Sequence, residues 1–150
     1  MNNKQKELME YLRVYVMIWQ KIDFIWGMFI TSYIPLFGFL HFYQGDIGAV
    51  FAVMIVVAIA GFTLINATAL RDHYEIAVTM STEFRKHNKD FQDLNGALSR
   101  TSHNGKAAMV LMTHGCAFAG FLFLMAVRVA KRHCVEGSDG WICTLASFAG

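Results

Sequence analysis

Long uncharged runs of apolar residues dominate the sequence. Residues 24–43, 47–70 and 107–127 contain no Asp, Glu, Lys or Arg, and in the 24 residues of the middle run only Thr63, Asn66 and Thr68 are polar. A helix of that length covers about 36 Å at 1.5 Å per residue, enough to cross a hydrocarbon core of roughly 30 Å. The pattern therefore predicts an all-α membrane protein with three transmembrane helices, forming a single membrane domain over residues 1–150.

Shorter and more polar segments flank these spans. Residues 1–23 mix apolar and charged positions and predict an amphipathic N-terminal helix, which either lies in the interface or, as we expect, runs directly into the first span. Residues 44–48 suffice only for a turn, so spans one and two are expected to be antiparallel neighbours. In the tail, 128–150, the apolar stretch 141–149 is too short to cross and is expected at the outer interface or as a re-entrant segment.

The region 71–106 is the largest polar part of the chain. Its apolar residues keep roughly to one helical stripe, at Ile76, Met80, Phe84, Phe91, Leu94 and Leu98. A straight helix from 71 to 98 would end about 40 Å from the membrane, too far for the remaining residues to return comfortably. The sequence therefore predicts a cytoplasmic helical hairpin between spans two and three, with its turn near residues 87–90 or at Asn95–Gly96, and a second break at Asn104–Gly105.

Small residues four positions apart mark helix faces that allow close approach of another helix. One such pair begins span two, and two adjacent pairs lie in span three, where the partner is either span two or a second copy of the chain. The residues are Gly48 with Ala52, Gly115 with Ala119, and Cys116 with Gly120. In span one, Pro35 removes a backbone donor and predicts a kink.

Composition and charge agree with a membrane protein and set its orientation. Of the residues, 55% are hydrophobic and 16% charged, against about 25% charged in soluble domains. A net charge of +2 predicts no nucleic-acid partner. Four Lys or Arg lie in 1–23 and six in 71–106, against three in the tail. The positive-inside rule then predicts a multi-pass protein of the inner (plasma) membrane with a cytoplasmic N-terminus and an outside C-terminus.

Each span carries polar side chains at a similar depth, counted from its cytoplasmic end. They are Thr31, Ser32, Thr63, Asn66, Thr113 and His114. This level lies about 10 Å inside the boundary, where an unsatisfied polar group costs several kcal/mol. Two interpretations remain open: hydrogen bonds that hold the spans together, or a polar constriction of a pore or proton path, with His114 as the deep ionisable group.

The cysteines and histidines give no clear metal or cofactor site. Cys134 and Cys143 lie in the tail at a spacing that can close a disulfide, and the alternative is two unpaired thiols. Zinc bound by His133 and these cysteines would lack a fourth ligand and a known spacing, so no metal is predicted. A haem needs two axial ligands at matched depth, but His41 and His114 lie at different depths, so no cofactor is predicted.

No motif in the sequence fixes a reaction. There is no HExxH, no GxSxG, no phosphate-binding glycine loop and no pair of carboxylates within the spans, so we expect a non-enzyme. The first hypothesis is a small homo-oligomeric membrane protein that forms or gates a pore, with 71–106 as coupling element and contact for a cytoplasmic protein. The alternative is a non-catalytic accessory subunit bound to partner membrane subunits, and a membrane-embedded enzyme or redox subunit is third. Membrane lipid is a partner in each case.

Overall fold

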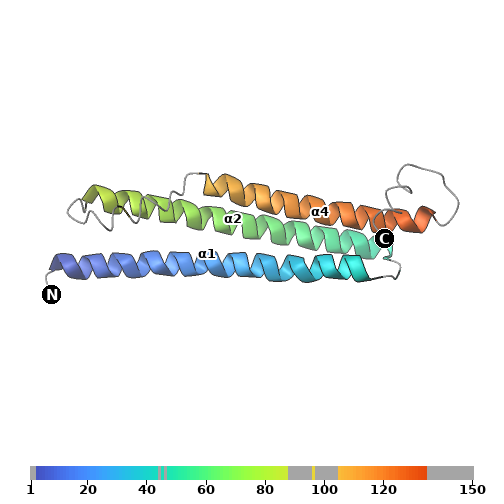
Figure 1. The fold of residues 1–150 in the computed structure, drawn as a ribbon, viewed down its shortest axis with the longest axis horizontal. Helices are drawn as coiled ribbons and strands as arrows, with labels where there is room; N and C mark the ends of the chain where they lie inside the picture. Colours follow the sequence, from blue (N-terminus) through green and yellow to red (C-terminus); the bar gives the residue numbers. More distant parts are fainter. Residues whose placement is uncertain (1–2, 44, 46, 88–95, 97–104, 135–150) are drawn as a thin grey trace. The chain divides into compact units, whose positions relative to one another are not determined.

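The computed structural model describes residues 3–43, 45, 47–87, 96 and 105–134, and its regular structure is helical (Figure 1). Helix α1 covers Asn3–Phe42, α2 covers Ala49–His87 and α4 covers Lys106–Cys134. At 1.5 Å per residue their 40, 39 and 29 residues correspond to about 60, 58 and 43 Å. Within the described residues, three helices are long and apolar enough to cross a membrane, which confirms the predicted all-helical, three-span class.

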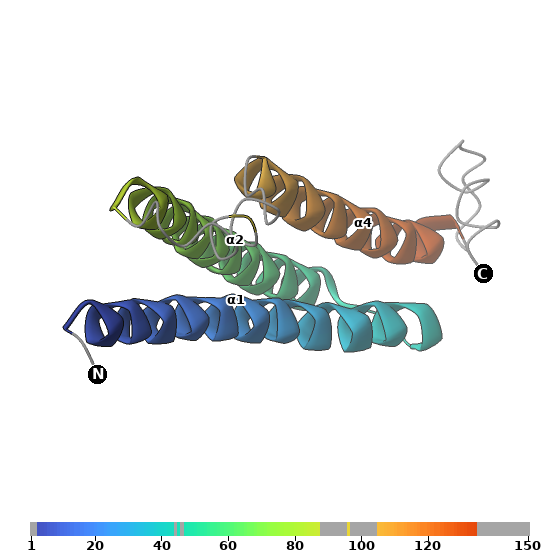
Figure 2. The ribbon, with the colours of Figure 1, turned by 60° about the vertical axis from the view of Figure 1, so that its left-hand side comes forward.

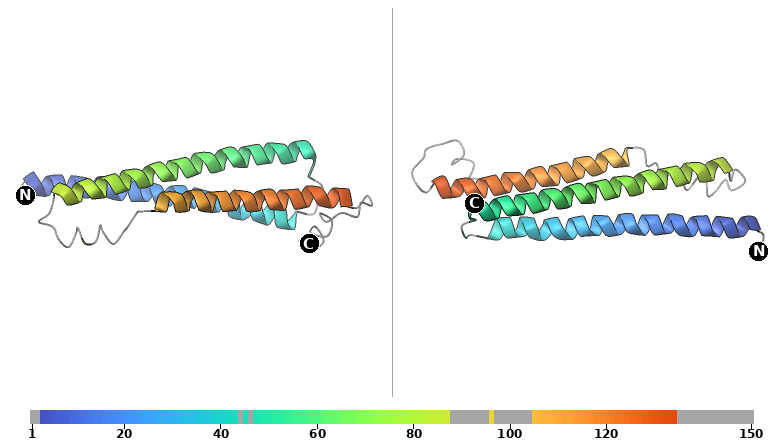
Figure 3. Two further views of the ribbon diagram at one scale, coloured as in Figure 1. Left: turned by 90° about the horizontal axis from the view of Figure 1, so that it is seen from above. Right: turned by 180° about the vertical axis from the view of Figure 1, so that it is seen from behind.

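Helix boundaries follow local sequence signals. Helix α1 runs unbroken from the charged N-terminal segment through Pro35, as Figures 2 and 3 also show. Helix α2 begins after the short connection, where the amide of Ala52 donates to the carbonyl of Gly48 at 2.9 Å. Gly105 precedes α4 with a φ of 90°, a left-handed conformation that favours glycine, so the predicted break at Asn104–Gly105 falls here.

Span two continues as one helix well beyond residue 70. Helix α2 contains the predicted span and the first half of the polar region, up to His87. The turn and second arm of the predicted hairpin fall in 88–104, where only Gly96 is described, in helical conformation. The apolar segment 141–149 lies outside the described residues.

The chain divides into two compact units, and each unit takes a segment from all three helices. Unit 1 comprises Met1–Met28 and Asn66–Met112, and unit 2 comprises Phe29–Ile65 and Thr113–Gly150. Their interiors are built from different side chains.

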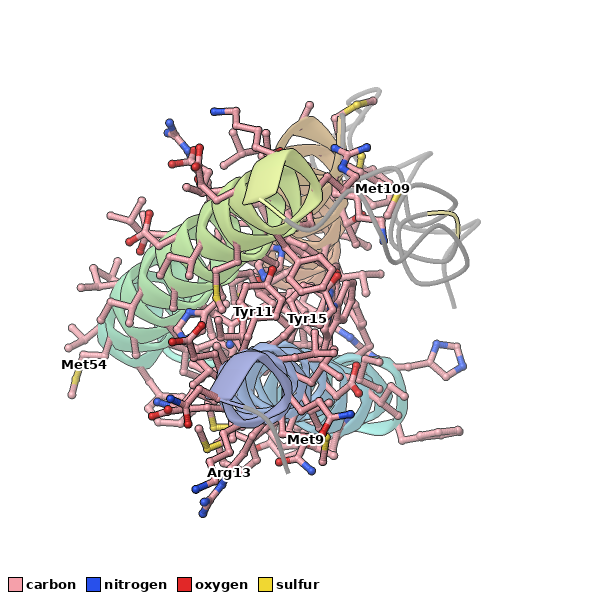
Figure 4. All side chains as sticks on the ribbon, turned by 90° about the vertical axis from the view of Figure 1, so that its left-hand side faces the viewer. Met9, Tyr11, Arg13, Tyr15, Met54 and Met109 are labelled. Carbon is pink, nitrogen blue, oxygen red and sulfur yellow. The ribbon has the colours of Figure 1, made fainter. Side chains whose placement is uncertain are left out.

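Unit 1 has an aromatic and aliphatic interior. One buried cluster comprises Ile22, Ile25, Ala67, Leu70, Tyr74 and Val110, and a second comprises Tyr15, Ala77 and Phe84. Tyr11 stacks on Phe84 with ring centroids 4.6 Å apart. In Figure 4, Tyr11 and Tyr15 point from α1 towards α2, whereas Met9 and Arg13 point away. The N-terminal part of α1 is therefore paired with α2 along one face only.

Unit 2 exposes many large apolar side chains and has polar contacts in its interior. Its fully buried residues include Leu40 and Phe121. At one end, Arg128 of α4 donates from Nε to the carbonyl oxygen of Leu40 at 2.7 Å and from Nη2 to that of His41 at 2.5 Å. These are among the last carbonyls of α1, which lack partners within the helix, so Arg128 caps α1.

Candidate functional site

The six polar residues predicted at one depth divide into buried and exposed groups. Thr63, Asn66 and His114 are 8%, 4% and 1% exposed. Thr31, Ser32 and Thr113 are exposed. Side chains at the same depth along three helices thus need not all point into the interior, because successive residues are rotated by about 100° around the helix axis.

Thr63 of α2 pairs with Tyr33 of α1 inside unit 2. The two hydroxyl oxygens are 2.5 Å apart, and Thr63 also donates to the carbonyl oxygen of Ile59 at 2.6 Å. A hydroxyl has a single hydrogen, so Tyr33 is the donor to Thr63. Both hydroxyls are then satisfied, which an apolar interior requires. Tyr33 is not among the polar residues predicted from the sequence, although it lies next to Ser32 and its hydroxyl can donate a hydrogen bond.

His114 of α4 completes this group through Phe29. The imidazole and the Phe29 ring have centroids 4.0 Å apart, and the Phe29 and Tyr33 rings are 4.7 Å apart. Tyr33, Thr63, His114 and Phe29, which we call the buried polar cluster, thus bring together side chains from all three helices. Its chemistry suits the joining of helices, since its hydroxyls are bonded to each other and to backbone.

Asn66 makes a comparable contact in unit 1. Its side-chain nitrogen donates to the carbonyl oxygen of Ile25 at 3.3 Å, which joins α2 to the backbone of α1. Asn66 is buried, and a buried side-chain amide without a hydrogen bond would destabilise an apolar interior. The bond to Ile25 provides a partner for this amide.

Unit 1 also holds an aromatic site that the sequence analysis did not identify. The Nζ of Lys106 lies 5.0 Å from the ring centroid of Trp19 and 5.7 Å from that of Tyr74. The two rings meet edge to face, with centroids 6.0 Å apart and planes at 79°. Trp26 donates from Nε1 to the hydroxyl of Tyr74 at 3.1 Å and so holds the Tyr74 ring in place. We call Trp19, Tyr74 and Trp26 the aromatic cradle.

A sequence signal for this cradle existed. Trp19 precedes the first span by a few residues, Tyr74 follows the second, and Lys106 precedes the third. Aromatic and Lys side chains are enriched at this level of a membrane protein. The sequence alone does not show that these three residues meet.

The predicted helix-packing residues are mostly uncovered within one chain. Gly115, Cys116 and Ala119 are exposed, and a Cβ built on Gly115 would meet nothing within 4 Å. Gly120 is the exception, because its Cβ position lies 3.8 Å from the Phe37 ring. In span two, Ala52 is buried, while Gly48 is exposed. Span two therefore does not cover Gly115, Cys116 and Ala119, which we call the small face of α4.

The described residues hold no group of three His, Cys, Asp or Glu able to bind a metal ion. Cys116 is a free, exposed thiol. The possible disulfide between Cys134 and Cys143 lies outside the described side chains. Pro35 lies within α1, and its kink stays a prediction.

Comparisons with known proteins place the chain in no family. No family model, curated protein or solved structure matches it. Functional inference therefore rests on the three apolar helices, the buried polar cluster, the small face of α4 and the aromatic cradle.

Proposed function

We propose that the chain is a non-catalytic, three-span membrane protein that assembles with copies of itself through the small face of α4. The helices of unit 1 form its coupling element. The observation that carries this proposal is the exposure of Gly115, Cys116 and Ala119 within the uncharged stretch 107–127 of α4. Without a hydrophobic force between helices in lipid, close backbone approach at small residues favours association.

The outward face of α2 offers a contrast within the same chain. Many of its exposed residues in unit 2 are large, among them Val50, Val53, Met54 and Val57, each more than 60% exposed. Its small exposed residues Ala58 and Gly61 lie between exposed large ones such as Val57 and Leu64. Large aliphatic side chains suit contact with lipid acyl chains, whereas a small face leaves a shallow surface that another helix can fill. The contrast favours α4 over α2 as the assembly helix.

The polar groups inside the chain support an assembly role. Thr63 is hydrogen-bonded to Tyr33, and Asn66 is hydrogen-bonded to the backbone of Ile25, so both have partners within one chain. Helices α1 and α2 continue together through unit 1, where ring contacts join them. Helices α1 and α2 both continue beyond their apolar stretches. A movement of the two spans can therefore be transmitted along these helices to a protein partner bound at 71–106.

Cys116 provides a direct test, because it lies on the small face itself. The native cysteine is kept in a Cys134→Ser, Cys143→Ser background, and the protein is oxidised in membranes with copper phenanthroline. We expect a disulfide-linked dimer. The matched control moves the thiol to α2 by combining Cys116→Ser with Val57→Cys, which should give at least tenfold less dimer.

Lipid dilution separates assembly from random collision. Dimer that persists when the lipid-to-protein ratio is raised tenfold supports assembly, and Gly115→Leu should abolish it, because a large side chain separates the backbones. Equal cross-linking through Cys116 and Val57→Cys, or a monomer at every protein density, would overturn the proposal.

A pore between copies is a second candidate, favoured by a separate observation. Thr31, Ser32 and Thr113 are exposed hydroxyl side chains within the uncharged stretches 24–43 and 107–127, and a ring of such groups can line a water path. Single-channel recording in planar bilayers tests it. Thr113→Val should change the conductance, while Thr82→Val, in unit 1, should leave it unchanged; silent bilayers containing assembled protein would exclude the pore.

We also propose that the protein lies in the inner (plasma) membrane, with its segments 1–23 and 71–106 on the cytoplasmic side. The excess of Lys and Arg in 1–23 and 71–106 supports this orientation. A single cysteine introduced at Glu7, with the native cysteines replaced, should resist a membrane-impermeant maleimide in intact cells and react after lysis. Labelling in intact cells would reverse the orientation.

A further inference from the structure

The strongest feature that the proposed function does not use is the aromatic cradle of unit 1. It presents two ring faces at nearly a right angle, and a primary ammonium group already lies over both. Ring faces carry negative electrostatic potential, and such corners bind alkylated ammonium ligands. The cradle therefore has the chemistry of a cation site.

The ammonium of Lys106 lies over the rings of Trp19 and Tyr74. Within the described part of the chain, its ammonium forms no ion pair, and its contacts are the rings of Trp19 and Tyr74. A cation–π contact contributes about 0.5–1 kcal/mol when exposed and about 2 or more when desolvated. This contact is weak enough for another cation to replace it.

The start of α4 does not depend on Lys106 for its place in unit 1. Val110, one turn further along the same helix face, is fully buried in the cluster with Leu70 and Tyr74. If the Lys106 side chain leaves, Val110 still holds α4 to unit 1. The cradle itself is also preserved, because Trp26 orients Tyr74 independently of Lys106.

The position of the cradle along the sequence identifies the kind of cation. Trp19 lies shortly before Asp23, the charged residue that precedes the first apolar stretch, and Tyr74 lies shortly after Arg71, the charged residue that follows the second. In a three-span protein this level is that of the lipid headgroups, where amphipathic rings gather. The most concentrated organic cations there are the ammonium groups of zwitterionic lipids.

We propose that the aromatic cradle binds the ammonium of a lipid headgroup, with the choline type preferred, and that Lys106 is a built-in competitor for the same rings. Lipid binding displaces the Lys106 side chain and leaves α4 anchored by Val110. The proposal does not depend on assembly through α4.

The test follows Trp19 directly. The full chain is labelled with 5-fluorotryptophan in maltoside micelles, which contain no ammonium group, and the Trp19 ¹⁹F resonance is assigned by its loss in Trp19→Phe. Tetramethylammonium chloride is the probe, with sodium chloride as the salt control. Lys106→Met should show a saturable shift of the Trp19 resonance with tetramethylammonium only.

Wild type should require about 3- to 30-fold more probe for the same shift, the range that corresponds to a cation–π contact. Lys106→Arg should behave as wild type, because a guanidinium still occupies the rings. The matched control Lys86→Met removes an exposed Lys of α2 and should also match wild type. If Lys106→Met fails to fold, Lys106→Gln and the wild-type titration carry the test.

The source of the ammonium is decided in vesicles. In phosphatidylcholine the lipid should fill the cradle of Lys106→Met, so that added tetramethylammonium no longer shifts Trp19; in phosphatidylglycerol the titration should persist. Equal titration in both vesicles would overturn the lipid assignment. The absence of a saturable shift in folded Lys106→Met and Lys106→Gln would overturn the site itself.

Discussion

Units 1 and 2 share the same three helices but differ in the side chains that they expose. Unit 1 carries charge on its surface, including the pairs Arg71–Glu75 at 2.8 Å and Lys86–Glu83 at 2.6 Å, around ring-rich clusters. In unit 2, the described parts of α1 and α2 carry no charged side chain, and many large apolar residues are exposed. The chain thus changes its exterior midway along α1 and α2.

This difference indicates which force holds each unit together. Burial of apolar side chains away from water stabilises a unit that faces water. In lipid that force is absent between helices, so packing and hydrogen bonds remain. We therefore expect side-chain truncation to cost most in unit 1, and polar contacts to matter most in unit 2.

The largest expected effect is the loss of Phe84, which is 3% exposed and stacks on Tyr11 in unit 1. Phe84→Ala should lower the free energy of unfolding by about 3–5 kcal/mol, as for buried aromatic residues elsewhere. Ile76→Ala, 48% exposed on the same helix, should cost under about 1 kcal/mol. Denaturant titration in mixed micelles, followed by circular dichroism, compares the two. Equal costs would mean that water does not drive the packing of unit 1.

The sequence predicts the position of each residue along its helix, but it does not predict the direction in which the side chain points about the helix axis. The three uncharged runs set which part of each helix can span a membrane, because length and charge are properties along the helix axis. They do not set rotation about the axis. Thr31 and Tyr33 are two positions apart, and so point to opposite sides of α1, one exposed and one buried. Rotation comes from packing between helices, which a single sequence does not display.

The same limit applied to the candidate sites. Gly115 and Ala119 predicted a close helix contact, but not that the face would be uncovered within the chain. In the sequence Lys106 is one of six basic residues in 71–106, and nothing there indicates that its ammonium lies over Trp19 and Tyr74, 87 and 32 positions earlier. Contacts this distant in sequence leave no periodic pattern.

A middle-sized effect is expected at Arg128, whose guanidinium caps α1 in unit 2. Arg128→Gln should cost about 1–2 kcal/mol, because charge-assisted hydrogen bonds are stronger than neutral ones but this one is partly exposed. The same substitution should raise the rate of amide hydrogen exchange near Leu40. Arg71→Gln removes an exposed pair one turn apart in unit 1 and should cost clearly less than Arg128→Gln, because water screens an ion pair between exposed side chains. Similar costs for both arginines would remove the distinction between an interhelical cap and a local ion pair.

The smallest effect, and the sharpest comparison of forces, concerns the hydrogen bond between Tyr33 and Thr63 in unit 2. Tyr33→Phe keeps the ring against Phe29 and deletes the donor, while Thr63 keeps its own bond to Ile59. Hydrogen bonds between membrane helices average about 0.6 kcal/mol and reach about 1.7 kcal/mol. A double-mutant cycle with Thr63→Val should give a coupling energy in that range, measured in lipid. The parallel change Tyr43→Phe, at an exposed ring, should show none with Thr63→Val. A coupling near zero for Tyr33 would mean that packing alone, without this bond, holds α1 against α2 in unit 2.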